Sequence, residues 1–325
     1  MKLAILGSGK IVHDFLPVVK DIPELEVKAI FGTVRSIGKM EALQTKFEID
    51  QVYTDIEECL ASEAFDTVYV ALPNHLHFSF AKKALENGKH VICEKPFTLQ
   101  KAELLELEAL ASEKNLVLIE AITNQYLPNF EGIKTALNTI GELKIIECNY
   151  SQYSSRYDDF KAGTILPAFN PKMGGGALMD INIYNIHLVV GLLGKPLGVN
   201  YYANVEQKID TSGMLVLDYG KQKVVCIGAK DSTASIRSTI QGTQGSIIIN
   251  GPTNTLDSFT IESLKGEVQT VNDNQHAHRM YEEFAVFDRV IQENDQEFVK
   301  QQLMHSKIVM EIVEAALEDA KIHLG

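Results

Sequence analysis

Two ionisable residues and a proline follow a short apolar run at residues 91–93. They are Glu94, Lys95 and Pro96, and the apolar run predicts a buried strand. The carboxyl end of an inner strand is where open α/β sheets bind their ligands. Charged side chains are seldom fully buried unless they are paired, so a Glu-Lys pair at this position needs an explanation. Either the pair is a solvated strand end, or Lys95 faces a bound ligand.

A glycine-rich turn follows the first predicted strand, residues 2–6. Two glycines let the backbone turn tightly and approach a pyrophosphate, and the amino terminus of the next helix favours that negative charge. Val12 stands where the G-x-G-x-x-G pattern has its third glycine. The position of the turn, before a series of strand–helix units, favours a dinucleotide site over a plain tight turn. The predicted cofactor-binding residues here are Gly7, Ser8, Gly9, Lys10 and Ile11.

The end of the second predicted strand bears on which dinucleotide is bound. NAD-selective sites usually place Asp or Glu there to accept a hydrogen bond from the ribose. This chain has neither, and Thr33, Arg35 and Ser36 offer donors for a phosphate instead. The cofactor is therefore predicted to be NADP or NAD, with NADP favoured. The alternative is that Arg35 is a solvated residue at a helix start.

The first 120 residues alternate between strand and helix patterns. Such alternation predicts βαβ units around a parallel sheet, and hence a Rossmann-like doubly wound domain. Predicted strands are 2–6, 26–31, 51–53, 67–72, 89–93 and 116–120, and predicted helices are 11–20, 36–47, 55–62, 78–87 and 101–114.

Residues 66–74, His77 and residues 88–96 together resemble the glucose–fructose oxidoreductase / inositol dehydrogenase / MocA (Gfo/Idh/MocA) family, whose hallmark is Glu-Lys-Pro. The resemblance covers essentially the whole chain. It implies a Rossmann domain, a second α+β domain with a large open sheet, and Lys95 acting on the substrate. It also implies that the cofactor is lined by Leu72, Pro73, Asn74 and Glu94. His77 matches a family position too, and it either contacts the cofactor or is satisfied by the backbone.

A second stretch with chemical side chains begins after three glycines at 174–176. Asp180, Tyr184 and His187 follow at helical spacing i, i+4 and i+7, which places them on one face of a helix. Apolar residues cover most of the remaining surface, so the helix should be buried and its polar stripe should line a cavity. The alternative is that these side chains are satisfied by hydrogen bonds in the core.

In the family, this helix supplies Asp180 and the residue four positions later as partners of the lysine. That residue is Tyr184, as in the branch with Tyr in place of the catalytic His. His187 stands where many relatives have aspartate. It either contacts the substrate or only packs against other side chains. A polar aromatic loop at 151–161 contains Arg156, a further candidate for substrate binding, although surface position alone explains such a composition.

A strand-rich region follows residue 194, with turn signals at the close spacing of an antiparallel sheet. The predicted strands of this region are 199–206, 214–219, 224–229, 235–241, 245–250, 259–263 and 268–271, and one further strand, 143–150, precedes it. The closing helices are 278–293 and 305–321. We predict an NAD(P)-binding domain at 1–120 and a substrate and dimerisation domain at 121–325. The last helix, about 303–322, is expected to pack back on the first domain, and the open sheet to form dimers.

Composition narrows the class of protein. The 325 residues carry a net charge of −13 without a long basic run, so nucleic acid is an unlikely partner. No apolar run approaches the roughly 20 residues of a membrane span. Four scattered cysteines lack metal or redox spacing, which predicts free thiols, a cytoplasmic location and no bound metal.

These observations together predict hydride transfer between NAD(P) and the hydroxyl or carbonyl carbon of a sugar, polyol or diol. Lys95, Tyr184 and Asp180 are the predicted catalytic residues. An unperturbed phenol has a pKa near ~10, so Tyr184 needs a neighbouring cation to act as a base. Two alternatives remain open: a catalytically silent NAD(P)-binding sugar sensor, and an enzyme that uses the nicotinamide transiently without net redox change.

Overall fold

The computed structural model describes residues 1–325, whose contacts group them into two compact units. The first unit contains Met1–Ala121 and His278–Met304, and the second contains Ile122–Ala277 and His305–Gly325. The division made from the sequence instead assigned everything after residue 120 to the second domain.

The first unit is built on a six-stranded parallel sheet in the order β3-β2-β1-β4-β5-β6. Chain order reverses beside β1, because β2 lies on one side of it and β4 on the other. This arrangement confirms the predicted doubly wound fold. Its elements are β1 (Lys2–Leu6), α1 (Lys10–Val19), β2 (Glu26–Phe31), α2 (Ile37–Phe47), β3 (Gln51–Tyr53), α3 (Ile56–Leu60), β4 (Thr67–Val70), α4 (His77–Glu86), β5 (His90–Glu94), α5 (Lys101–Glu113) and β6 (Leu118–Ala121).

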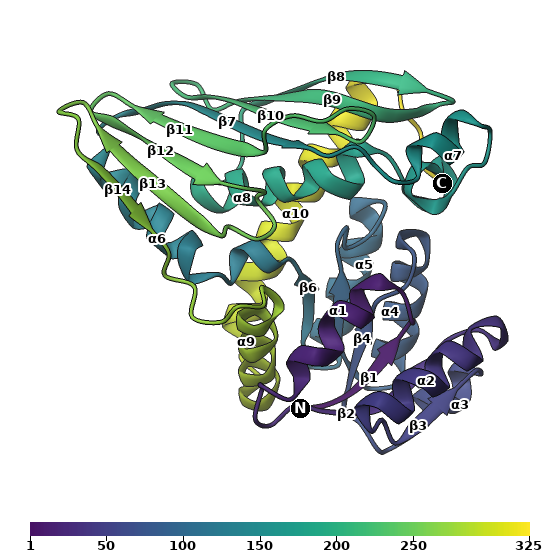
Figure 1. The fold of residues 1–325 in the computed structure, drawn as a ribbon. Coiled ribbons are helices and arrows are strands. Elements are labelled where there is room, and N and C mark those ends of the chain that lie inside the picture. The colour runs from purple at the N-terminus through teal and green to yellow at the C-terminus, as the bar shows by residue number, and fades with distance from the viewer. The chain divides into compact units, whose positions relative to one another are not determined.

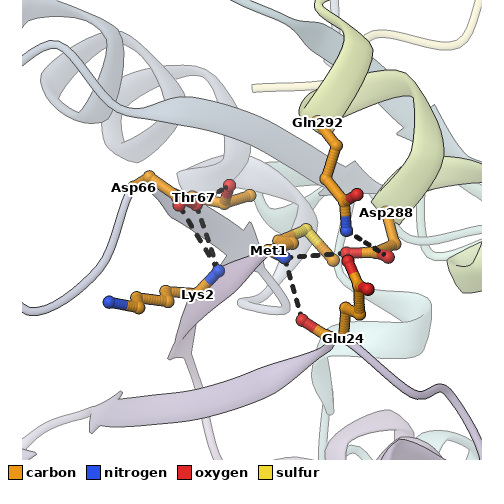
Figure 2. A network of polar contacts seen from close by, with 7 residues as sticks. All are labelled: Met1, Lys2, Glu24, Asp66, Thr67, Asp288 and Gln292. Carbon is orange, nitrogen blue, oxygen red and sulfur yellow. Dashed lines mark hydrogen bonds and ion pairs between the residues drawn. The ribbon is translucent and has the colours of Figure 1, made fainter.

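Helix α9 (Met280–Glu293) belongs to the first unit because its aromatic side chains complete that unit's core. Phe284 contacts both Phe15 of α1 and Tyr69 of β4, with ring centroids 4.0 and 5.1 Å apart. Burial of aromatic rings in such pairs is among the larger contributions to core stability. On the same helix, Asp288 forms an ion pair with the Met1 amino group at 2.8 Å (Figure 2). The returning segment is therefore fixed by both apolar and ionic contacts.

The second unit is built on an eight-stranded sheet in the order β14-β13-β12-β11-β7-β10-β9-β8. All neighbouring pairs are antiparallel except β10 and β7, which confirms the predicted open and mostly antiparallel sheet. Helices α6 and α8 lie against one face of it (Figure 1). The elements are α6 (Pro128–Ala136), β7 (Leu143–Ser151), α7 (Tyr157–Lys161), α8 (Ile183–Leu193), β8 (Gly198–Glu206), β9 (Ile209–Asp218), β10 (Lys223–Ala229), β11 (Arg237–Gly242), β12 (Gly245–Asn250), β13 (Ser258–Ser263), β14 (Val268–Val271) and the later part of α10 (Gln296–Asp319).

Strand β9 begins five residues earlier than predicted. Its first residues include Asp210, Thr211 and Ser212, whose composition is typical of a loop. All three are buried, and their side chains are hydrogen-bonded within the unit. Buried polar side chains are tolerated when they are paired in this way. The hydrophobic alternation that signals a strand is therefore absent from these positions.

The helix that carries the candidate residues begins irregularly. Leu178–Asn182 forms a π-helical turn, and α8 continues from it as a regular α-helix. The stretch Pro171–Leu193 is long and apolar enough to cross a membrane by length and composition, contrary to the expectation that no run would be. However, 72% of its most apolar window is buried inside the fold, as in the core helix of a globular unit. The π turn also means that the simple i, i+4 geometry does not apply between Asp180 and Tyr184.

Candidate active site

Four strands of the first unit end side by side, and their loops carry the predicted cofactor residues. The parallel register pairs Leu6 with Phe31 on one side and with Val70 on the other, and Val70 with Cys93. Gly7, Ala71 and Glu94 therefore leave the sheet at one level, at its carboxyl edge. A ligand site at this edge, next to the strand-order reversal, is the general arrangement of open α/β sheets.

The glycine turn has the shape that a pyrophosphate requires. Gly7 has a φ of +122°, and a Cβ atom there would lie 2.3 Å from the carbonyl oxygen of Ala71. Above Gly9 there is open space, with no atom within 4 Å of a Cβ position. Helix α1 starts at Lys10 without a side-chain cap and without an acidic residue in its first turn. Its first N–H groups can therefore receive an anion, so these residues fit a dinucleotide.

The loop after β2 is exposed and carries an arginine that has no acidic partner. Thr33 and Arg35 are exposed, and Arg35 forms no ion pair. The Ser36 hydroxyl donates to the Thr33 carbonyl oxygen at 2.7 Å, which fixes the turn between the strand and α2. The loop therefore offers a guanidinium and hydroxyl groups to an anion.

His77 lies beneath two of the strand-end loops. Its ring is fully buried, with Nε2 2.8 Å from the carbonyl oxygen of Leu72 and Nδ1 2.8 Å from that of Pro96. Burial lowers the pKa of this imidazole. Both ring nitrogens are therefore engaged by backbone, as in the alternative stated for it above. The side chain holds together the Leu72–Asn74 turn and the turn after Lys95, rather than projecting from them.

Glu94 is the last residue of β5, and Lys95 follows it in the row of strand ends. The Tyr69 hydroxyl donates to the Glu94 carboxylate, and both side chains are engaged within the first unit. Burial raises the pKa of Glu94, while the hydrogen bond from Tyr69 and the charge of Lys95 act in the opposite direction. Lys95 is half-buried. The sheet thus presents one carboxyl group and one ammonium group beside the glycine turn.

In the second unit, Asp180 of the π turn pairs with a buried lysine. The Nζ atom of Lys230 lies 2.7 Å from Asp180 Oδ2. The lysine side chain is 3% exposed and the aspartate side chain 38% exposed. The pair therefore has one member in the core and one accessible to a ligand.

The other faces of this helix are fastened to the sheet and to the chain that enters the unit. Asn182 donates to the Cys226 carbonyl oxygen at 3.0 Å, and Gly228 leaves the space that Asn182 fills. Asn124 donates to the carbonyl oxygen of Tyr184 at 2.9 Å, and Gln125 to that of His187 at 3.0 Å. Tyr184 itself is 8% exposed. The helix is therefore held rigidly where its polar residues leave the core.

His187 does not lie with Asp180 on an open face. It is fully buried, and its Nδ1 lies 2.9 Å from Nε2 of His305 on α10. Burial lowers the pKa of His305 well below the ordinary value, and the neighbouring His187 acts in the same direction. The imidazole pair thus joins α8 to α10 within the second unit, which corresponds to the packing alternative for His187.

Arg156 caps the short helix α7 and is exposed, without an ion pair. The structure does not bring it into contact with Asp180 or Tyr184. The loop around it is instead ordered by aromatic contacts, such as the stacked rings of Phe160 and Phe169, 4.8 Å apart. Phe169 also lies under Lys230, with 4.4 Å between Nζ and the ring centroid.

Comparison with known proteins identifies the family. The model of the "Oxidoreductase family, NAD-binding Rossmann fold" matches residues 1–122, and that of the "GFO/IDH/MocA C-terminal domain" matches residues 135–248. The chain belongs to the GFO/IDH/MocA oxidoreductase family. It is accordingly an NAD(P)-binding oxidoreductase, as its motifs predicted.

Individual GFO/IDH/MocA relatives resemble the chain over most of its length. It is 34% identical to scyllo-inositol 2-dehydrogenase (NADP(+)) IolU of Bacillus subtilis, over 97% of this chain and 96% of the relative. It is 28% identical to trans-1,2-dihydrobenzene-1,2-diol dehydrogenase of Xenopus tropicalis, over 77% and 79%. The crystal structure of KijD10, a 3-ketoreductase from Actinomadura kijaniata, has a TM-score of 0.85 at 21% identity, covering 97% and 98%. This last similarity concerns the fold.

Several residues that organise the site carry no local signal in the sequence. Lys230 follows a strand as a single lysine, and nothing in its neighbourhood marks it as buried. Asp210 is buried, accepts from the Tyr201 hydroxyl at 2.7 Å and from the Leu178 backbone N–H at 2.6 Å, and so caps the π turn. Gly176 leaves room for it, because a Cβ there would lie 2.1 Å from Asp210 Oδ1. Only the glycine run at 174–176 hinted that something approaches the backbone there.

Proposed function

We propose that this chain is an NADP-dependent dehydrogenase that oxidises a secondary hydroxyl of a cyclic polyol, diol or sugar, and reduces the corresponding ketone in reverse. The observation that carries the proposal is the position of Lys95. It follows the inner strand β5 at the sheet edge that also carries the glycine turn. The substrates named for the inositol and dihydrodiol dehydrogenase relatives support this class.

The residues of the first unit would hold the dinucleotide. Gly7, Ser8, Gly9, Lys10 and Ile11 would bind the pyrophosphate through backbone N–H groups. Leu72, Pro73, Asn74 and Glu94 would line the nicotinamide side of the site, with His77 fixing their loops from below. When bound, the nicotinamide supplies a hydride acceptor. What this chain adds is orientation and the transfer of one proton.

We assign the proton transfer to Lys95 and Tyr184. In the oxidative direction, the substrate hydroxyl hydrogen-bonds to both groups and gives its proton to the deprotonated phenol oxygen of Tyr184. A cation beside a phenol favours its deprotonated form, and Lys95 is the group that we assign to this role. Asp180 accepts a hydrogen bond from a second hydroxyl of the substrate. Arg156 and His187 have no contact in the structure that supports a part for them in this step.

The preference for NADP rests on the loop after β2. Thr33 and Arg35 are exposed there, Arg35 has no ion pair, and residues 31–36 contain no carboxylate that would repel a phosphate. A guanidinium binds phosphate through charge-assisted hydrogen bonds. The name of the Bacillus relative also specifies NADP(+).

A substrate screen combined with two substitutions tests the proposal. Purified protein is incubated with inositols, aldoses and trans-diols, and the reduction of NADP⁺ or NAD⁺ is followed by absorbance. We expect turnover with at least one vicinal diol. Lys95→Met and Tyr184→Phe should each lower that turnover by about 10²-fold or more. Their dissociation constants for NADPH should stay within about threefold of the wild type.

Three results would contradict this proposal. Wild-type turnover in both variants would remove Lys95 and Tyr184 from the chemistry. Absence of turnover with every diol, together with tight NADPH binding, would favour the silent sensor instead. Substrate conversion without net formation of NADPH would point to transient use of the nicotinamide.

We further propose that the exposed face of the second unit's sheet binds a second copy of the chain. Tyr202 and Met214 are paired across β8 and β9 and are 63% and 49% exposed, whereas their neighbours Tyr201 and Leu215 are buried on the other face. Exposed apolar residues on a flat sheet are typical of association surfaces. Light scattering should give the mass of a dimer, and Tyr202→Glu with Met214→Glu should give that of a monomer.

A further inference from the structure

Lys230 is a buried cation directed at the part of the second unit that carries Asp180. It follows β10, and its backbone N–H donates to the Thr211 carbonyl oxygen at 2.8 Å. Its side chain is 3% exposed and ends 2.7 Å from Asp180 Oδ2. A lysine is almost never fully buried unless it is paired, so the ion pair accounts for its position.

The ammonium group has few alternatives to Asp180. It donates to the carbonyl oxygen of Ala168 at 2.5 Å and lies over the ring of Phe169. Both contacts come from the ordered loop before the glycine run, and they leave one direction for a carboxylate. A buried ammonium held on three sides in this way cannot swing to solvent. Its charge is therefore fixed in place relative to the π turn.

Two further carboxylates lie near Lys230, and each has its own hydrogen-bond donors. Burial raises the pKa of Asp210, and the charge of Lys230 acts in the opposite direction. Asp210 of β9 accepts from Tyr201 of β8 and from the Leu178 N–H. Asp231, next to Lys230 in the chain, accepts from Thr211 and Ser212 at 2.7 Å each. Lys230 therefore forms its ion pair with Asp180, which is 38% exposed and can also meet a ligand.

We propose that Lys230 is a positioning residue that keeps the Asp180 carboxylate ionised and oriented. Asp180 then acts as a permanent hydrogen-bond acceptor for a substrate hydroxyl, and it does not take the proton of the reaction. This restricts the substrate to a compound with a second hydroxyl close to the one that is oxidised. The inference rests on the proposed function for its kinetic consequence, whereas the ion pair itself can be tested without any substrate.

Thermal unfolding of single and double variants tests the pair. Asp180→Asn removes the ion-pair partner of a buried ammonium and should lower Tm by roughly 5 °C or more. Lys230→Met should cost less, because the exposed Asp180 can be solvated by water. The double variant Asp180→Asn with Lys230→Met should recover at least half of the loss of Asp180→Asn. Tm losses that simply add would overturn the pairing.

A matched control is available on β10, the strand that Lys230 follows. Lys223 of β10 pairs with Asp218 at 2.9 Å, but both side chains are about half exposed. Exposed ion pairs contribute little to stability, so Lys223→Met should change Tm by less than about 2 °C. A loss as large as that of Asp180→Asn would show that Tm in this sheet does not report on buried charge, and would overturn the interpretation of the cycle.

The kinetic test uses a substrate of the wild-type protein. Lys230→Met should lower kcat/KM by about tenfold at neutral pH, because Asp180 without its cation protonates more readily. The acid limb of the pH profile should move to higher pH, so that the activity returns as the pH is raised. NADPH affinity should not change.

A loss that is independent of pH would refute the positioning role. Failure of the wild type on every diol would refute the proposed function, while the unfolding cycle would still decide the ion pair.

Discussion

Alanine substitutions at the two glycines of the first turn should affect different properties. Gly7→Ala should lower stability, and Gly9→Ala should weaken cofactor binding. Gly7 has a φ of +122°, and an added Cβ would lie 2.3 Å from the Ala71 carbonyl oxygen and 2.9 Å from its carbon. Both contacts involve backbone in a buried strand end, which cannot move aside without disturbing the sheet. Gly9 has a φ of −79°, and a Cβ there would meet nothing within 4 Å. The Ala71 backbone therefore leaves no room for a side chain at Gly7, whereas a side chain at Gly9 would meet no other atom.

The expected magnitudes follow from this geometry. Alanine at a left-handed backbone position costs about 1–2 kcal/mol, and overpacking a rigid site adds about 1–3 kcal/mol. Gly7→Ala should therefore lower the free energy of unfolding by roughly 2–5 kcal/mol. Gly9→Ala should cost less than about 1 kcal/mol, because alanine is only a poorer helix cap than glycine. A methyl group at Gly9 nevertheless occupies the space through which a pyrophosphate reaches the helix, and the loss of one charge-assisted bond weakens binding about tenfold to a hundredfold.

Urea unfolding followed by circular dichroism measures the first effect, and NADPH fluorescence titration measures the second. The Gly9→Ala variant is the control for folding, because it must unfold nearly as the wild type does. The structural reasoning is refuted if Gly7→Ala unfolds within about 0.5 kcal/mol of the wild type. The assignment of the dinucleotide site is refuted if Gly9→Ala binds NADPH as tightly as the wild type.

Three further outcomes are expected. Arg35→Ala should weaken NADPH binding by about tenfold or more and leave NADH binding nearly unchanged, measured in the same titration. Burial raises the pKa of Glu94, so its contribution to stability is lost as pH rises through the folded-state value. The stability of Glu94→Gln relative to the wild type should therefore increase as the pH rises above the ordinary value of 4.5, measured by urea unfolding at several pH values. Burial lowers the pKa of His305, so the wild type should lose stability as pH falls below the ordinary value of 6.5, and His305→Gln should reduce that loss.

The sequence predicted the first unit well because its signals are local. Each strand is a short apolar run, and each turn after it contains glycine, proline or a charged pair, as at Gly7, Pro73 and Glu94. In a parallel sheet, the chain direction alone brings those turns to one edge. The family, the fold and the NAD(P)-dependent chemistry could therefore be inferred before any contact was known.

Residues that depend on contacts distant in the sequence could not be predicted. The return of α9 to the first unit depends on Phe284 meeting Phe15 and Tyr69, and no local pattern reveals such a meeting. The start of β9 reads as a loop, because its polar side chains are buried and paired instead of exposed. Hydrophobic periodicity identifies a buried face only when that face is apolar.

The sequence alone determined which groups can act, namely a lysine at a strand end and an aspartate and a tyrosine on a downstream helix. Only the tertiary structure determined which neighbouring groups the candidate side chains contact. His77 is engaged by two backbone carbonyl groups, His187 is paired with His305, and Asp180 is paired with Lys230, 50 positions away. The reason is physical: a side chain's type fixes its chemistry, whereas its charge state and direction are set by neighbours that only folding brings within a few ångströms.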